Sequence, residues 1–350
     1  MRRLPVYFLI DVSESMVGEP LEQVQDGIAT IIKELRTDPY ALETVWVSVI
    51  AFAGKSQVLM PLTDIIQFYP VKLPIGSGTS LGVGLDALMK EFDSSLIKST
   101  SEQKGDWKPI VFLFTDGKPT DNPKQSIEKW KSNYSNSSFF VSISLGKDTD
   151  TKILSEITEN NLSFNGTDSA SFKQFFKWVT ASIKATSTKI AESQTQSIDL
   201  TKGADKIIDK AENTEGINKI DESVAVFLAK CQTNKVPYLI KYSKEVKPSE
   251  FAGMDLNTMF YKLNGAYVID EESYNRLSDE SSSQSRQIST EELLGFPTCP
   301  SCGNQFGFST CSCGGLLCVG DEEITTCPWC KTQAKFGVGE GHLNINRAKG

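Results

Sequence analysis

Two groups of residues in this sequence have the types and spacing to bind metal ions. Seven of the eight cysteines lie between Cys299 and Cys330. Thiolates are soft ligands that suit zinc. A second group, in the N-terminal half, consists of hydroxyl and carboxylate side chains in three short loops. Oxygen ligands of this kind suit hard cations such as magnesium. The sequence therefore predicts two metal-binding regions of different chemistry.

The spacing of the clustered cysteines favours metal binding over disulfides. The segment CPSCGNQFGFSTCSCGGLLCVGDEEITTCPWC contains Cys299, Cys302, Cys311, Cys313, Cys318, Cys327 and Cys330. Its two Cys-Pro-x-Cys turns can aim a pair of thiolates at one ion about 2.3 Å away. An odd number of crowded cysteines is atypical of a disulfide framework. So short a segment also buries too little apolar area to fold alone, whereas structural zinc contributes about 10–16 kcal/mol.

The cysteine spacing leaves the number of zinc ions open. One ion needs four ligands, which the two outer turns supply as Cys299, Cys302, Cys327 and Cys330. Alternatively, the seven cysteines and His342, the only histidine, make eight ligands for two ions. In one such interleaved arrangement, one ion takes Cys311, Cys313, Cys327 and Cys330, and the other takes Cys299, Cys302 and Cys318. The remaining cysteine, Cys231, lies in an apolar run, and we expect a buried core thiol there.

The oxygen ligands follow apolar segments that are typical of buried strands. VYFLI (6–10) precedes Asp11-Val12-Ser13-Glu14-Ser15, and IVFLF (110–114) precedes Thr115-Asp116-Gly117. Between them, GSGTS places Thr79 ahead of an apolar helical pattern that Thr79 or Ser80 can cap. Strand patterns alternate with helix patterns over this half. They predict an α/β fold with a mostly parallel sheet flanked by helices, whose binding crevice lies beyond the carboxyl ends of the strands.

This combination resembles the metal-ion-dependent adhesion site (MIDAS) of von Willebrand factor A domains, which have a Rossmann-like fold. The five matching residues are Asp11, Ser13, Ser15, Thr79 and Asp116. The resemblance covers residues 1–187. It implies that the two serines ligate Mg²⁺, or Mn²⁺ or Ca²⁺, directly, that the threonine can do so, and that the aspartates often act through water. It also implies a vacant position on the ion that accepts a carboxylate or phosphate from a partner.

The cysteine-rich tail extends the resemblance to the bacterial TerY family, named for tellurite-resistance gene clusters. We predict a TerY-C-like domain at 223–345 with a zinc module at 296–336, joined by a polar linker or helix at 188–222. Some members are encoded beside a protein kinase and a PP2C-type phosphatase. The resemblance thus implies a non-enzymatic scaffold in a stress-response or phosphosignalling system, with those enzymes as candidate protein partners. Partner identity, the stress and the oligomeric state stay open.

Composition narrows the alternatives. The 350-residue chain has a formal net charge of −8, which disfavours general binding to nucleic acid or anionic lipid. No segment approaches the about 20 apolar residues of a membrane span, and Asp11 interrupts the first apolar run, so we expect a cytoplasmic protein. The alternative functions are a nucleic-acid-binding adaptor acting through the zinc module and, less favoured, a metal-dependent phosphoesterase. We expect two further loop acids, Glu14 and Asp121, to be solvated.

Overall fold

A computed structural model describes residues 2–116, 118–145, 151–164, 169–191, 209–210, 223–251, 254–279, 287–320, 322, 324–336 and 343–348. By internal contacts the chain forms two compact units. The first consists of Met1–Val12, Glu19–Leu73 and Thr79–Lys219. The second consists of Ser13–Gly18, Pro74–Gly78 and Ile220–Gly350. None of the helices in the described part of the chain has the length and apolar character needed to cross a membrane.

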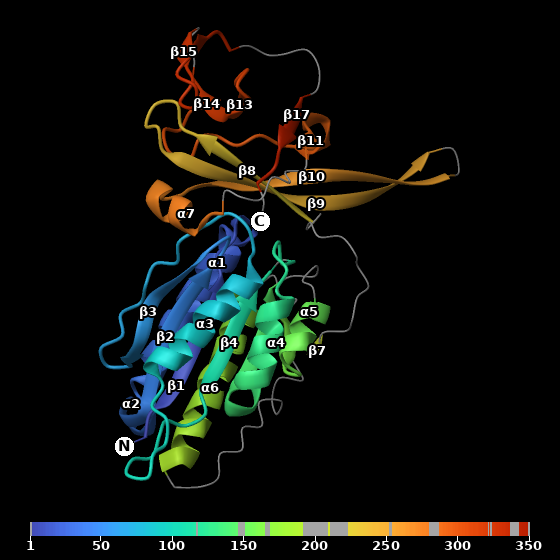
Figure 1. Ribbon diagram of the computed structural model, residues 1–350. Coiled ribbons are helices and arrows are strands. Elements are labelled where there is room, and N and C mark those ends of the chain that lie inside the picture. The colour runs from blue at the N-terminus through green and yellow to red at the C-terminus, as the bar shows by residue number, and fades with distance from the viewer. Residues whose placement is uncertain are drawn as a thin grey trace. The chain divides into compact units, whose positions relative to one another are not determined.

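The first unit contains a mostly parallel sheet (Figure 1). Its order is β3-β2-β1-β4-β5-β6-β7. In that order the strands are Ser56–Asp64, Val45–Phe52, Leu4–Asp11, Ile110–Thr115, Phe139–Leu145, Asn161–Phe164 and Asp209–Lys210. The five central strands pair in parallel, and the two edge strands, β3 and β7, are antiparallel. The predicted strands at 6–10 and 110–114 therefore lie side by side, and β2 pairs with the other edge of β1.

Helices cover both faces of this sheet (Figure 1). Helices α1 (Glu19–Leu35) and α2 (Pro39–Thr44) pack against α6 (Ser169–Ala191) on one face. Helices α3 (Leu81–Ser95), α4 (Lys124–Asn133) and α5 (Thr151–Ile157) pack together on the other. This is the predicted α/β architecture with helices flanking a mostly parallel sheet.

Alternating strand residues supply the two halves of the core. Tyr7 and Leu9 of β1 are buried among the apolar residues of α3, α4 and α5. The intervening Phe8 faces the opposite side and stacks on Phe112 of β4. Successive strand side chains point to opposite faces, so a strand buried on both sides must be apolar throughout. The unbroken VYFLI segment is explained in this way.

The second unit contains a sheet of order β12-β10-β9-β8-β14-β13. These strands are Leu293–Leu294, Met254–Val268, Pro237–Phe251, Val224–Lys230, Leu316–Val319 and Phe306–Thr310. Strands β9 and β10 form a long hairpin that extends past the rest of the sheet (Figure 1). The remaining elements are η1 (Glu14–Met16), α7 (Glu271–Leu277), η3 (Thr290–Glu292) and two short pairs, β11 (Gln287–Ser289) with β17 (Asn344–Asn346) and β15 (Thr325–Thr326) with β16 (Gln333–Ala334).

Two predictions concern the segment that joins the domains. Helix α6 continues to Ala191, past the predicted domain end at residue 187. Most of the predicted linker or helix at 188–222 lies outside the described residues. Within it, Asp209–Lys210 pair with β6 as a strand and are not helical.

Candidate metal centres

The cysteines of the second unit form two groups of four. One group contains Cys231, Cys299, Cys302 and Cys318, and the other contains Cys311, Cys313, Cys327 and Cys330. Within each group all Sγ atoms lie within 4.8 Å of one another. Four thiolates at about 2.3 Å from a tetrahedral zinc ion are separated from each other by about 3.8 Å. The resolved Sγ pairs match that spacing, at 3.7 and 3.9 Å in the first group and 3.8 and 3.9 Å in the second.

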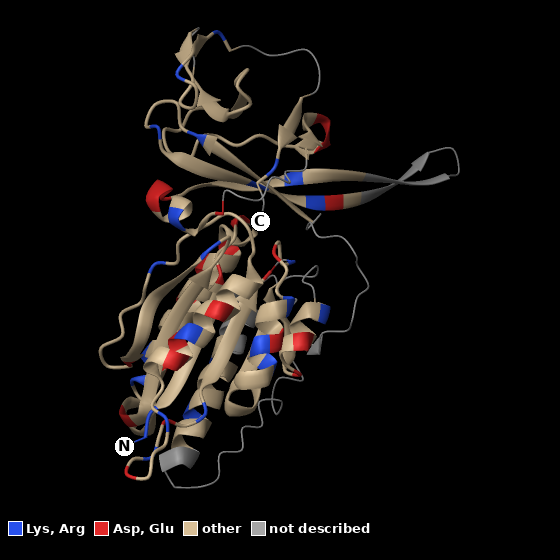
Figure 2. Cartoon of the chain, viewed as in Figure 1, with Lys and Arg blue, Asp and Glu red and all other residues tan. Residues whose placement is uncertain are grey.

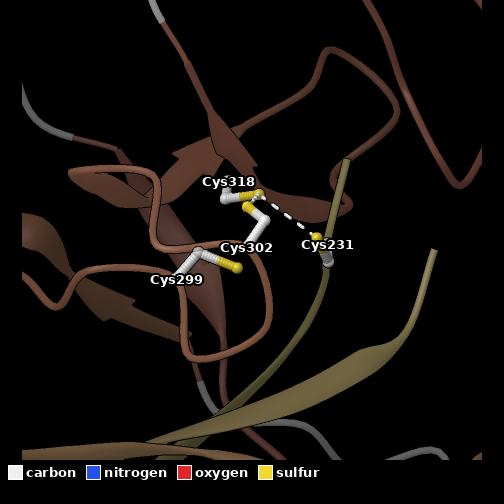
Figure 3. A group of neighbouring side chains, drawn as sticks. All are labelled: Cys231, Cys299, Cys302 and Cys318. Carbon is white, nitrogen blue, oxygen red and sulfur yellow. Dashed lines mark hydrogen bonds between the residues drawn. The ribbon is translucent and has the colours of Figure 1, made fainter. Parts of the chain in front are cut away.

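The first group draws its ligands from two distant parts of the chain (Figure 3). Cys231 lies immediately after β8, and its Sγ is 3.9 Å from that of Cys318 in β14. Cys302 contributes a thiol 3.7 Å from the same Cys318 sulfur. Strands β8 and β14 pair in parallel, which brings the end of β8 to the cysteine-rich segment. Figure 3 shows the four sulfurs turned toward one shared space.

Three turns of the same kind begin at candidate zinc ligands: Cys231, Cys299 and Cys327. The amides of Cys299 and Cys327 donate to the carbonyls of Asn304 (2.8 Å) and Thr332 (2.9 Å). The Cys231 amide donates to Val236 in the same manner, at 2.9 Å. In each turn the residue four positions after the cysteine has a positive φ: 60° at Lys235, 78° at Gly303 and 65° at Lys331. Such φ values are uncommon for residues other than glycine, so two lysines in this conformation mark turns fixed by their surroundings.

Within each group, the local environment lowers the pKa of one thiol and raises the pKa of another. Burial raises the pKa of Cys231, but amide donors including Asn234 outweigh it and bring the pKa to about 7. Burial raises the pKa of Cys318 far above its usual range. In the second group, hydrogen bonds from Thr332 lower the pKa of Cys330 to about 6, while burial raises that of Cys327 to about 11. Adjacent thiolates repel one another, and a divalent cation that binds all four removes that repulsion.

The structure therefore groups Cys231 with three of the clustered cysteines, which the sequence did not predict. Cys231 is fully buried, as expected of a core thiol, but it also completes the first group of four. The two groups follow the interleaved arrangement and not the single ribbon of the outer turns. His342 lies outside the described residues. Sequence reasoning missed Cys231 because it has no second cysteine nearby; the only signal was that seven clustered cysteines are one short of two complete sites.

The oxygen-rich loops of the first unit lie at one edge of its sheet. Asp11 ends β1, and Asp116 directly follows β4, the neighbouring parallel strand. The Asp11 side chain is fully buried, and its Oδ2 accepts a hydrogen bond of 2.7 Å from the hydroxyl of Thr115. Asp116 is partly exposed. The carboxyl ends of adjacent parallel strands thus carry both predicted aspartates, at the edge where α/β sheets bind ligands.

Thr79 is fixed by its backbone in a third loop. Its amide donates to Thr120 Oγ1 at 2.9 Å, and its carbonyl accepts from the Thr120 amide at 2.8 Å. The preceding Gly78 has φ of 88°, a conformation that a residue with a side chain adopts only with strain. The Thr79 side chain is nearly fully buried and precedes α3. The GSGTS sequence is thus explained by a turn that delivers Thr79 to this position.

Ser13 and Ser15 belong to the loop segment that clusters with the second unit. Both are buried, and their hydroxyl oxygens lie 3.0 Å apart. The neighbouring Glu14 is also fully buried, and its carboxylate accepts from the hydroxyls of Ser77 (3.2 Å) and Tyr274. The prediction that Glu14 is a solvated charge is therefore wrong. The two serine hydroxyls are thus brought together by a turn of 3-10 helix, η1, which begins directly after Ser13.

The expectation for Asp121 is also wrong. Its Oδ2 accepts a hydrogen bond of 2.8 Å from the Gly82 amide in the first turn of α3, and its Oδ1 is buried. Burial raises the pKa of this carboxyl group, although the amides at the start of α3 act in the opposite direction. Ser80, at the N-cap position, makes no side-chain cap bond. The predicted cap from Thr79 or Ser80 is thus supplied by Asp121.

Both groups of residues fit the ions that their chemistry suggests. The thiols have the mutual spacing of a tetrahedral sulfur site. The oxygen group supplies three hydroxyls and two carboxylates, a set suited to Mg²⁺, which takes few carboxylates and keeps some of its water. Neutral hydroxyls leave much of the charge of such an ion uncompensated.

Comparison with known proteins identifies both halves of the chain. Residues 6–178 match the model of the von Willebrand factor type A domain, and residues 221–350 match that of the TerY-C metal binding domain. Similar solved structures include proximal thread matrix protein 1 from the mussel byssus, with 17% identity, a TM-score of 0.39, and coverage of 52% of this chain and 48% of that chain. A second is the pilus adhesin SpaC from Lactobacillus rhamnosus GG, with 12% identity, a TM-score of 0.43, and coverage of 53% and 31%.

The chain thus spans about half or less of the length of those two proteins. Together, the two domain matches and the paired four-cysteine groups show a von Willebrand factor type A domain followed by a TerY-C metal binding domain, which is the architecture of the TerY-like family.

Proposed function

We propose that this chain is a non-enzymatic, cytoplasmic scaffold of a bacterial stress-response or phosphosignalling system, such as one for tellurium resistance. Its MIDAS would recruit an acidic or phosphorylated protein partner in a metal-dependent manner. The observation that carries the proposal is the placement of Asp11 and Asp116 at the carboxyl ends of adjacent strands, with Thr79 held in the next loop. A kinase or a PP2C-type phosphatase is the partner class that the TerY-like architecture suggests.

The proposed cation is Mg²⁺, with Mn²⁺ or Ca²⁺ as substitutes. Ser13, Ser15 and Thr79 would bind it through hydroxyl oxygens, while Asp11 and Asp116 would act directly or through water. When bound, the ion supplies a Lewis-acidic position for a partner carboxylate or phosphate. Thr115 keeps the Asp11 carboxylate oriented through its 2.7 Å hydrogen bond. The chain's own contribution is thus to hold several oxygens in place and to leave the ion with net positive charge.

We propose two Zn²⁺ ions for the TerY-C domain, one for each four-cysteine group. Apart from the β9–β10 hairpin, the described strands of this domain have seven residues or fewer. Thiols of both groups occur among its core residues, namely Cys231, Cys299 and Cys318 of the first group and Cys311 and Cys327 of the second. Zinc would tie β8 and β14 to the cysteine-rich turns and so stabilise the domain by metal binding. The domain would then present a second protein-binding surface.

The charge distribution favours a protein partner over nucleic acid. Within 296–336 the only basic residues are Lys331 and Lys335. Over α3 and α4 of the first unit, basic and acidic residues alternate without a broad patch of one sign (Figure 2). Nucleic-acid-binding surfaces are typically basic stripes or patches. Phe306 is 58% exposed, so one aromatic side chain of the zinc module is open to contact with a partner.

The proposed function is tested by affinity capture of partners from the source cell. Wild type and Asp11→Ala/Thr79→Ala are immobilised in zinc-loaded form and exposed to lysate with and without Mg²⁺. We expect a specific protein to be retained by the wild type only when Mg²⁺ is present. The matched control is Thr30→Ala/Asp86→Ala, which removes an exposed hydroxyl and an exposed carboxylate from α1 and α3.

Retention of the same proteins by wild type and Asp11→Ala/Thr79→Ala would contradict the proposal and assign partner binding to the zinc domain. Loss of retention in the control variant as well would show that capture does not depend on the cation site. Replacing the lysate by the purified captured protein, with and without phosphatase treatment, then distinguishes a phosphorylated from an acidic partner.

A further inference from the structure

Two residues outside the five proposed cation ligands connect the loops that carry those ligands. Thr120 and Asp121 lie in the segment between β4 and α4, a few positions after Asp116. Each makes a hydrogen bond to the loop and helix start that contain Thr79. The sequence suggested no role for Thr120 and assigned solvated charge to Asp121.

Thr120 forms hydrogen bonds with both the backbone amide and the backbone carbonyl of Thr79. The Thr79 amide donates to the Thr120 hydroxyl at 2.9 Å, and the Thr120 amide donates to the Thr79 carbonyl at 2.8 Å. Two bonds between the same pair of residues fix both the position and the orientation of the Thr79 backbone. Because Thr79 is β-branched, a fixed backbone leaves its hydroxyl few directions in which to point.

Asp121 makes the second connection, to the start of α3. Its Oδ2 accepts from the Gly82 amide at 2.8 Å. A Cβ atom at Gly82 would lie only 2.7 Å from that oxygen, so the close approach depends on glycine at this position. The carboxylate replaces the missing side-chain cap of α3, and the positive end of the helix dipole favours its negative charge.

The environment of Asp121 is unfavourable for a charge. Its Oδ1 is buried without a hydrogen-bond partner among the described residues, which costs free energy wherever the group is ionised. Ser80 already occupies the N-cap position of α3, but it is buried and makes no side-chain cap bond. The partly buried Asp121 side chain instead couples two segments that lie 39 positions apart in the sequence.

We propose that Thr120 and Asp121 are positioning residues for the cation site, locking the Thr79 loop to the loop of Asp116 so that both present their oxygens as one preformed unit. This inference rests on the proposed function, because it presumes that Thr79 and Asp116 bind a cation. Thr120 and Asp121 are not proposed as ligands; they would act through their hydrogen bonds to Thr79 and to the start of α3. Outer residues that orient metal ligands typically change metal affinity by about 10–100-fold when they are replaced.

The experiment measures Mn²⁺ affinity of the full-length, zinc-loaded chain by isothermal titration calorimetry. Mn²⁺ binds sulfur sites much more weakly than Zn²⁺ and so reports on the oxygen site. Thr120→Val removes the hydroxyl acceptor, whereas Thr120→Ser keeps it, and Asp121→Asn removes the charge but keeps an oxygen. Asn122→Ala, an exposed neighbour in the same loop, is the matched control.

We expect Thr120→Val and Asp121→Asn to weaken Mn²⁺ binding by about 10–100-fold, with Thr120→Ser and Asn122→Ala close to wild type. Amide hydrogen exchange provides a second readout: Mn²⁺ should protect residues 79–83 in the wild type and in Thr120→Ser, but much less in Thr120→Val. Zinc content and the melting temperature without Mn²⁺ identify a variant that has merely misfolded, in which case Asp121→Asn and Thr120→Ser carry the comparison.

The outcomes separate this inference from the proposed function. If Thr120→Val and Asp121→Asn bind Mn²⁺ like the wild type while Asp11→Ala abolishes binding, the positioning role is wrong and the cation site stands. If Asp11→Ala also leaves Mn²⁺ binding unchanged, or the wild type binds none, the cation site itself fails and both proposals fall.

Discussion

The carboxylate of Asp121 and the backbone amide of Gly82 are joined by a hydrogen bond of 2.8 Å, although 39 positions separate them in the sequence. The first turn of helix α3 is therefore capped by a side chain from the segment between β4 and α4, and not by its own N-cap residue, Ser80. The start of α3 and the segment between β4 and α4 are thus held together, and we expect this connection to affect both stability and metal binding.

The first consequence concerns Asp121 and pH. Burial raises the pKa of Asp121 above its ordinary value, so between the ordinary and the raised pKa the folded state binds more protons than the unfolded state. The contribution of this group to stability is therefore favourable at low pH and is lost as the pH rises through the raised value. At pH 7, in zinc-loaded protein without Mg²⁺, we expect Asp121→Asn to be at least as stable as the wild type in urea.

The difference between Asp121→Asn and wild type should shrink as the pH is lowered through the raised pKa of Asp121, because the carboxyl group then becomes neutral. A lower urea midpoint for Asp121→Asn at pH 7 would contradict this expectation and show that the charge of Asp121 stabilises the fold. If Asp121→Asn is as stable as the wild type or more stable, but binds Mn²⁺ more weakly, the Asp121 carboxylate serves the cation site and not the stability of the fold.

A second prediction concerns Gly82. Alanine is favoured over glycine in helices by about 1 kcal/mol, but a Cβ here would lie 2.7 Å from Asp121 Oδ2. We expect Gly82→Ala to displace the Asp121 carboxylate and weaken Mn²⁺ binding. A double-mutant cycle with Asp121→Ala provides the control, because the added methyl group should cost less once the carboxylate is absent and only the contacts to Pro123 Cα (3.2 Å) and Ser126 Oγ (3.3 Å) remain. Additive effects of the two substitutions would contradict this explanation.

A third prediction concerns Thr115, which is 4% exposed and donates to Asp11 Oδ2 at 2.7 Å. A hydrogen bond to a charged group contributes about 1.5–3 kcal/mol, so Thr115→Val should lower the free energy of unfolding by about that amount. Thr115→Ser keeps the hydroxyl and should lose less, mainly through the missing methyl group. Urea denaturation without Mg²⁺ measures both variants. Equal losses for valine and serine would assign the effect to packing.

A fourth prediction concerns the zinc content of the two four-cysteine groups. Cys231→Ser and Cys313→Ser each remove one thiol, from the first and the second group respectively. We expect the wild type to contain two zinc ions per chain and each variant to lose one of them, as measured by elemental analysis after gel filtration. If Cys231→Ser still contains two zinc ions per chain, Cys231 is a core thiol and not a zinc ligand, and the first group binds zinc through three thiols.

Much of this architecture follows from local sequence patterns. The strands at 45–52 and 110–114 are apolar and β-branched because they are buried on both faces, and period and composition suffice to identify them. The oxygen-rich loops that follow the strands at 6–10 and 110–114 suffice to indicate the sheet edge at which they lie. The Cys-Pro-x-Cys turns can also be recognised from the sequence, because both candidate ligands lie within one turn.

The features that the sequence did not reveal all depend on contacts between distant segments. Cys231 has no second cysteine within one turn, and only the pairing of β8 with β14 brings it to the other thiols. Glu14 and Asp121 occur in polar loops, where solvent exposure is the ordinary outcome for an acid. Their burial depends on partners many positions away, Tyr274 and Gly82, and no local pattern reports such a pairing.

The distribution of the eight thiols along the chain also sets an order of assembly. In the second group, Cys311 and Cys330 are 19 positions apart, whereas Cys231 and Cys318 in the first group are separated by 87. The entropy lost on closing the longer loop exceeds that of the shorter one by about 1.4 kcal/mol, or about tenfold in an equilibrium constant. If each group binds one zinc ion, we therefore expect a chelator to remove zinc from the first group before the second, so that β8 is the first element to lose its link to the cysteine-rich segment.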